Sequence, residues 1–285
     1  MERLTQEEAQ EEAKMKRFSN LGRIAMVVLS INIIFSIISI FLPSSFYAEP
    51  CCDSFISPSL HHLLGSDDLG MDIFYQIVHG SLISLLIGIS TAVISGIGGS
   101  LLGILAAYKG GKTDSIIMGV CDVLTALPHL PFIIVLSVFV GSGLNTIILV
   151  ISLLSWVGPA KMIRSKVLML KNEKFIVAAE SYGGNFIYIT FVHFLPQVFP
   201  MISVSMFKIA SHAIIAEASL SFLGLGDPTS KSWGLLLNHA ISFPGIYFTD
   251  YWKWWISSPL IMLILLILAL SFVARDFEKI LNKKL

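Results

Sequence analysis

Long apolar runs separated by short polar segments form the dominant pattern along this chain. Because the hydrocarbon core of a bilayer is roughly 30 Å thick, a helix that crosses it needs about 20 apolar residues. Three charge-free runs meet that length, at residues 24–42, 80–108 and 254–274. A fourth, 123–160, is too long for one helix, and Gly141-Ser142-Gly143 predicts a tight turn dividing it into two. With a further apolar segment at about 200–224, the pattern predicts an all-α polytopic membrane protein with six transmembrane helices.

The composition agrees with this pattern. Mean hydropathy is +0.80, 55% of the residues are hydrophobic and 13% are charged, against about 25% in soluble domains. We therefore expect the lipid bilayer to be the environment of most of the surface. The formal net charge is zero and no basic surface is evident, so no nucleic-acid partner is expected.

The positive charges are distributed asymmetrically. Of the 19 Lys and Arg residues, all but Lys208, Lys231 and Lys253 lie before residue 24, after residue 274, or in the second-to-third and fourth-to-fifth connections between predicted spans. Because cytoplasmic loops are enriched in Lys and Arg, both termini are predicted to be cytoplasmic. The first apolar run is too long for a signal peptide and follows an acidic tail, so we expect it to be retained.

This pattern predicts a single membrane domain with two short tails. We expect a cytoplasmic N-terminal tail at 1–22, a transmembrane domain at 23–277 and a cytoplasmic C-terminal tail at 278–285.

A polar, cation-rich segment at about 161–200 interrupts the membrane-like sequence. It contains Ala178-Ala179, then Gly183, then Leu195-Pro196. A short helix with small side chains can approach another protein closely, and Gly183-Gly184 lets such a helix end and the chain turn back. The spacing resembles the cytoplasmic loop by which ABC-transporter permeases dock onto their ATPases, although Val177 stands where that pattern has Glu. The resemblance implies an ATPase-docking set of Phe175, Ala178, Ala179, Tyr182, Gly183, Gly184, Leu195 and Pro196.

Two more segments resemble one branch of that family, the second permease of dipeptide, oligopeptide and nickel importers. The segment 62–72 resembles its external-loop signature at His62, Gly65, Asp67, Gly70 and Asp72, but Met71 replaces an Arg. The segment 217–226 resembles its Glu-x-x-Leu-Ser-Phe-Leu-Gly-x-Gly motif. After residue 274 only Arg275-Asp276 of the family's usual C-terminal pattern is present.

The resemblance implies the type I ABC importer permease fold, with 23–277 as the permease domain in a bacterial cytoplasmic (inner) membrane. It implies half of a translocation pore, a second permease subunit, two cytoplasmic ATP-binding subunits and an extracytoplasmic solute-binding protein. The chain has no phosphate-binding Gly-x-x-x-x-Gly-Lys-Ser/Thr loop, so ATP and Mg are expected on the partner ATPases, with no cofactor and no catalysis here. Di- or oligopeptides are the expected substrates; nickel or a nickel chelate is the alternative.

Polar side chains within the fifth predicted span have two interpretations. A charge facing lipid is costly, so Lys208, His212 and Glu217 should face protein or a water-filled path. They either line the substrate path near its outer gate or bond between helices. The path or gate set implied by the family segment is Lys208, His212, Glu217, Ser221, Gly224 and Gly226.

Some polar residues of the chain could in principle support metal binding or intramembrane catalysis. The cluster of His61, His62, Asp67, Asp68 and Asp72 could ligate a metal, but the family motif accounts for most of it. Adjacent Cys51 and Cys52 have no partner in sequence, so no metal site is expected. An intramembrane hydrolase would need a Ser with a base, and neither His129 nor His193 has such a partner in a known pattern.

Overall fold

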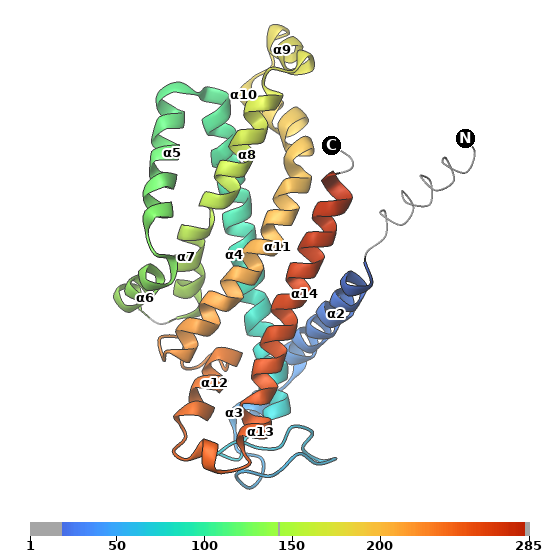
Figure 1. Cartoon of the computed structure of the whole chain (residues 1–285), viewed down its shortest axis with the longest axis vertical. Coiled ribbons are helices and arrows are strands. Elements are labelled where there is room, and N and C mark those ends of the chain that lie inside the picture. The colour runs from blue at the N-terminus through green and yellow to red at the C-terminus, as the bar shows by residue number, and fades with distance from the viewer. Residues whose placement is uncertain (1–18, 142, 283–285) are drawn as a thin grey trace, which may run out of the picture.

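The computed structural model describes residues 19–141 and 143–282; most of these residues are helical, and the one isolated β-bridge among them joins Ser66 and Asp72. Figure 1 shows long helices running side by side between two ends of the molecule. The helical elements are α2 (Asn20–Phe41), α3 (Ser45–Ala48), α4 (Ile73–Lys109), α5 (Gly111–Ala126), α6 (His129–Val140), α7 (Leu144–Ser155), α8 (Val157–Leu170), α9 (Lys174–Ser181), α10 (Phe186–Tyr188), the π-helical η1 (Ile189–Phe194), α11 (Leu195–Phe222), α12 (Trp233–Ser242), the 3-10 turn η2 (Ile246–Phe248), α13 (Trp252–Trp255) and α14 (Ser257–Asn282).

The described residues contain five candidate spans, or six when α5 and α6 are counted as one broken span, which agrees with the six predicted. Five helical stretches in the described residues are long and apolar enough to cross a membrane, namely 20–41, 73–109, 144–170, 186–222 and 252–280. The sixth pass is α5 with α6, which are bent by 96° where they meet. The end that carries α9 is called the α9 end below, and the other, with α12 and α13, the loop end (Figure 1).

The third span differs from the prediction. It begins at Gly111, not Val123, and its first helix, α5, ends at Ala126, because Pro128 cannot donate a backbone hydrogen bond and disfavours helix at Leu127. The two acidic residues of 111–122, Asp114 and Asp122, are paired with α8. Arg164 donates from Nε and Nη2 to the two carboxylate oxygens of Asp114, both at 2.5 Å, and Lys161 donates to Asp122 at 2.8 Å.

The boundaries of the expected docking loop also differ. Residues 161–170 belong to α8, which continues α7, so the connection is shorter than 161–200. The fifth span does not begin at Pro200; helix runs from Phe186 through both prolines to Phe222. The π turn in η1, where the Leu195 amide bonds to the Thr190 carbonyl five residues back, widens the helix just before Pro196.

Helix α4 is the centre of the bundle, packed by α2, α8 and α11. Small residues make this packing close: a side chain at Gly103 would press on the carbonyl of Ala160 in α8, and one at Gly88 would meet Ile214 in α11. Ile, Leu, Val and Phe side chains remain exposed around the outside, as expected of helices solvated by lipid tails.

The first and last spans are joined near the α9 end. The hydroxyl of Ser19 donates to Asp276 Oδ2 at 2.6 Å and caps α2 by accepting from the Gly22 amide. Arg275-Asp276, the remnant of the C-terminal pattern, therefore ties α14 to the start of α2. Residues 278–282 of the expected tail continue α14, and residues 1–18 of the expected N-terminal tail lie outside the described residues.

Candidate docking surface and outer loop

Helix α9 projects beyond the bundle at the α9 end and is anchored by one side chain (Figure 1). Ile176 is fully buried against apolar residues of α4, α8 and η1, including Ile104, Val167 and Ile189. Its neighbours Phe175 and Val177 are exposed. Burying an Ile side chain stabilises a fold by about 1.5–3 kcal/mol, so Ile176 attaches α9 firmly to the bundle. The opposite face of α9 stays exposed.

The turn after α9 depends on glycine. The amide of Gly183 bonds to the Glu180 carbonyl at 2.9 Å, and that of Gly184 to the Ala179 carbonyl at 2.9 Å. Gly183 has φ +85°, a left-handed conformation that side chains disfavour, and a Cβ on Gly184 would lie 2.7 Å from the Ala179 oxygen. This turn reverses the chain into α10 and leaves Tyr182 93% exposed.

An open groove of about 550 Å³ lies beside this turn. Five residues of the expected docking set line it, together with Asn185, Tyr188 and His193: Phe175, Ala179, Tyr182, Gly183 and Gly184. Ala178 is exposed on α9, whereas Leu195 and Pro196 form the first turn of α11 and do not line the groove. The docking role of these residues stays a prediction.

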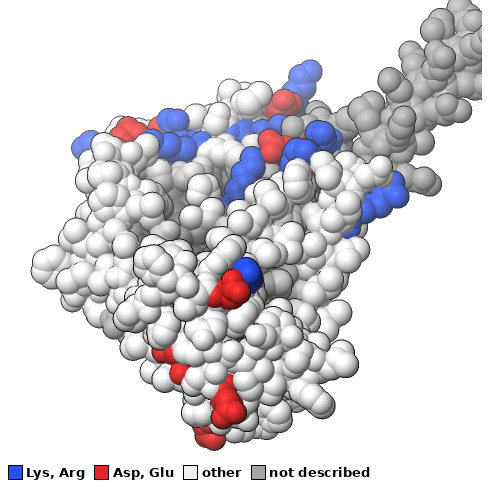
Figure 2. All heavy atoms as spheres, turned by 60° about the horizontal axis from the view of Figure 1, so that its bottom comes forward, with Lys and Arg blue, Asp and Glu red and all other residues white. Residues whose placement is uncertain are grey.

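Basic side chains gather at the α9 end, with a few acidic ones among them (Figure 2). Figure 2 shows Lys and Arg in a belt along that end, while acidic side chains dominate the loop end. The belt comes from the ends of α4, α5, α8, α9 and α14, with Lys109, Lys112, Lys166, Lys171 and Lys174 among its members. Lys171 also donates to the Tyr108 carbonyl at 2.6 Å, which joins the end of α8 to the end of α4.

The segment 51–72 at the loop end, called the outer loop below, is organised by carboxylates. Buried Asp67 accepts from the Leu69 and Met71 amides and from Gln76 Nε2 at 2.7–3.0 Å. Asp72 accepts from the Phe74 amide, capping α4, and bonds His62 Nδ1, each at 2.8 Å. The motif residues therefore hold the loop to the start of α4.

The two motif glycines allow close backbone contacts. Gly65 and Gly70 have φ of +72° and +74°. A Cβ on Gly65 would overlap the carbonyl oxygen of Ile56, and a Cβ on Gly70 would overlap that of Cys52.

Two side chains of the outer loop have raised pKa values. Burial raises the pKa of the Cys52 thiol to about 11, with a hydrogen bond from Cys51 adding to the shift. Burial, together with the neighbouring Asp67, also raises the pKa of Asp68.

The family segment 217–226 forms a packed junction between α11 and α12. Glu217 is 2% exposed and accepts from the Ser221 hydroxyl at 2.7 Å. Gly226 packs directly on Ser221, while exposed Gly224 (φ +76°) makes the turn that ends α11. Within this chain, Glu217 and Ser221 bond between themselves and face packed protein.

Lys208 and His212 lie elsewhere. They line a groove of about 250 Å³ with Arg275 and Glu278, and Lys208 donates to Glu278 at 2.9 Å. Glu217 lies about 13 Å from Lys208 along α11, towards the loop end. The structure therefore does not bring Lys208, His212 and Glu217 together at one outer gate. Whether either group lines a substrate path stays a prediction.

Two structurally important residues were not predicted from the sequence. Ile176 is one apolar residue among many, and only its burial marks it as the anchor of α9. Trp233 is fully buried, donates from Nε1 to the Ile77 carbonyl at 3.1 Å and packs on Gly80, which locks α12 onto α4. The Trp233-Gly234 pair that follows the family segment was the available signal.

The fold and these surfaces define a class: a polytopic helical membrane protein with a short exposed helix at one end and a structured loop at the other. Comparison with known sequences then gives the family. Residues 99–285 match the binding-protein-dependent transport system inner membrane component, and the chain belongs to this family. It is a permease subunit, and the expected class is confirmed.

Curated relatives extend the likeness over most of the chain. The dipeptide transport permease protein of Bacillus subtilis is 35% identical over 237 residues, covering 82% of this chain and 73% of the relative. The oligopeptide transport permease protein of the same organism is 32% identical over 276 residues, covering 95% and 88%. The glutathione transport permease protein of Pectobacterium atrosepticum is 40% identical over 186 residues, covering 65% and 62%.

Proposed function

We propose that this chain is one of two permease subunits of an ATP-driven importer of di- or oligopeptides. The observation that carries the proposal is α9 with its groove, an exposed surface anchored by Ile176 within the segment that matches the family. Peptide specificity is supported by relatives named as dipeptide and oligopeptide permeases. The three relatives described above are named for peptides and not for nickel.

The proposal assigns each end of the bundle to one side of the inner membrane. The basic belt supports a cytoplasmic position for the α9 end, because Lys and Arg concentrate on that side of a membrane protein. Two ATP-binding subunits, one for each permease, would bind ATP and Mg there and supply the hydrolysis. The outer loop would then face the solute-binding protein.

Force on α9 would reach the membrane helices through the core around Ile176. That core includes residues of α4, α8, η1 and α11, so α9 cannot move alone without losing buried contacts. Closure of the ATPases would tilt these spans together, and rigid-body motion of the two permeases would open the pore to alternate sides. Substrate enters and leaves without covalent change.

Uptake by cells that carry the complete transporter tests this function. Cells lacking this chain should lose uptake of a labelled dipeptide, and restoring the chain should recover it; uptake of radioactive nickel should stay unchanged. Loss of nickel uptake alone would show that the peptide assignment is wrong.

The docking step is tested by Gly183→Arg. A side chain at φ +85° strains the turn, and a bulky cation there fills the groove, so we expect at least a tenfold loss of uptake with normal membrane insertion. Gly111→Arg is the control, because Gly111 also has a positive φ (+53°), is exposed with no atom near its Cβ position, and lies outside the groove. Normal uptake by the Gly183→Arg variant would remove the docking role.

A further inference from the structure

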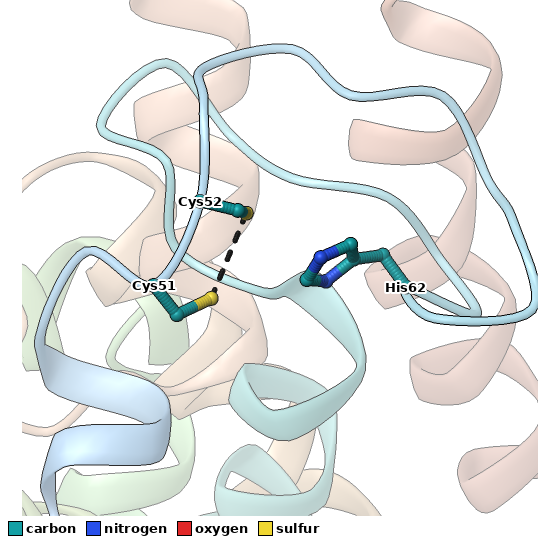
Figure 3. Close-up of side chains that lie close together, drawn as sticks. All are labelled: Cys51, Cys52 and His62. Carbon is teal, nitrogen blue, oxygen red and sulfur yellow. Dashed lines mark hydrogen bonds between the residues drawn. The ribbon is translucent and has the colours of Figure 1, made fainter.

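Two thiols and an imidazole meet in the outer loop. The sulfurs of Cys51 and Cys52 are 3.6 Å apart, and they and a ring nitrogen of His62 all lie within 4.8 Å of one another. Figure 3 shows the His62 ring pointing towards the two sulfurs from the opposite side of the loop. The sequence offered the cysteines no third ligand; the fold supplies one.

Separate anchors hold the three groups in place. The Cys51 and Cys52 amides both donate to the Gly70 carbonyl, at 3.0 and 3.3 Å. The His62 ring is held through Nδ1 by Asp72, whose other oxygen caps α4. Hence the cysteine pair is fixed by one turn of the loop and the imidazole by the start of a membrane helix.

The geometry suits a cation better than a disulfide. Two thiolates bound to one tetrahedral zinc at about 2.3 Å lie roughly 3.8 Å apart, close to the observed separation, whereas a disulfide needs about 2.0 Å. Because Asp72 occupies Nδ1, Nε2 is the nitrogen left for a metal. A carboxylate that orients a histidine in this way is the usual support of a metal ligand.

We propose that Cys51, Cys52 and His62 bind one thiophilic d10 cation, Zn²⁺ or Cu⁺, through the two sulfurs and Nε2. Asp72 is the positioning residue. These ligands satisfy a three-coordinate Cu⁺, whereas Zn²⁺ would keep a fourth position for water. Each thiol that binds the cation releases its proton, so binding should weaken as the pH falls. The cation would fasten the cysteine pair to α4 through His62 and Asp72.

Metal titration of the full-length chain in detergent tests the site. After reduction without added thiols and under exclusion of oxygen, Zn²⁺ is titrated against a chromophoric chelator and Cu⁺ against a Cu⁺-specific one. We expect one equivalent of at least one of them to bind, and Co²⁺ to produce thiolate-to-metal charge-transfer absorption. Binding should weaken at least tenfold in Cys52→Ser and in His62→Gln, which keeps a donor for Asp72 but lacks the imidazole.

Matched variants control for the loss of any thiol or imidazole. Cys121→Ser and His61→Gln should bind as the unmodified chain does, because Cys121 is buried in α5 and His61 is absent from the cluster. A measurement without mutation is protection of Cys51 and Cys52 from a maleimide by stoichiometric Zn²⁺ or Cu⁺. Undiminished binding by the Cys51→Ser/Cys52→Ser or His62→Gln variant, or no binding of either cation by the reduced chain, would overturn the site.

Discussion

At the residue scale, Gly70 combines a left-handed backbone with a contact that leaves no room for a side chain. We expect Gly70→Ala to destabilise the outer loop by about 2 kcal/mol or more, because a left-handed Ala costs roughly 1–2 kcal/mol before the overlap with the Cys52 carbonyl is counted. Faster proteolytic cleavage within 51–72 would report this. Gly98→Ala is the control, since Gly98 lies in a helix with open space at its Cβ position and should be neutral or slightly stabilising. Equal cleavage rates in the two variants would contradict the expectation.

At the element scale, the pairing of α5 with α8 depends on the two-pronged contact between Arg164 and Asp114, whose side chains are 30% and 21% exposed. Arg164→Ala should lower the free energy of unfolding by about 1.5–3 kcal/mol, because it strands a half-buried carboxylate. Thermal unfolding in detergent would measure the loss. Lys161→Ala breaks the neighbouring pair to Asp122, which is 72% exposed, and should cost at most about 1 kcal/mol. The reverse order of these effects would show that α5 is held in another way.

At the scale of the whole molecule, α9 and the outer loop lie at opposite ends of the helical bundle (Figure 1), so we expect them on opposite sides of the membrane. In a chain whose three cysteines are replaced by Ser, we expect an impermeant maleimide added to intact cells to modify Leu60→Cys and not Tyr182→Cys. The native side chains are 96% and 93% exposed, so accessibility within the chain does not distinguish them. Permeabilised cells should show modification of both. Labelling of Tyr182→Cys alone in intact cells would invert the orientation.

The sequence by itself determined the membrane class, the six passes and the positions of the three family segments. Hydrophobic length and charge asymmetry follow from what each residue costs in lipid, which is a property of the residue and its neighbours along the chain. The need for glycine at positions such as Gly70 and Gly183 could likewise be predicted, because a left-handed backbone at a turn depends on the local sequence.

Only the tertiary structure decided which residues act together. The charges of α5 looked incompatible with a span until Arg164 and Lys161 of α8 were placed beside them. Lys208 and Glu217 looked like one polar lining, yet each finds a different partner, Glu278 or Ser221. Likewise His62 reaches the cysteine pair only through the fold of the outer loop. Pairings between distant segments depend on how the helices pack, and no local pattern along the chain encodes which distant residues come together.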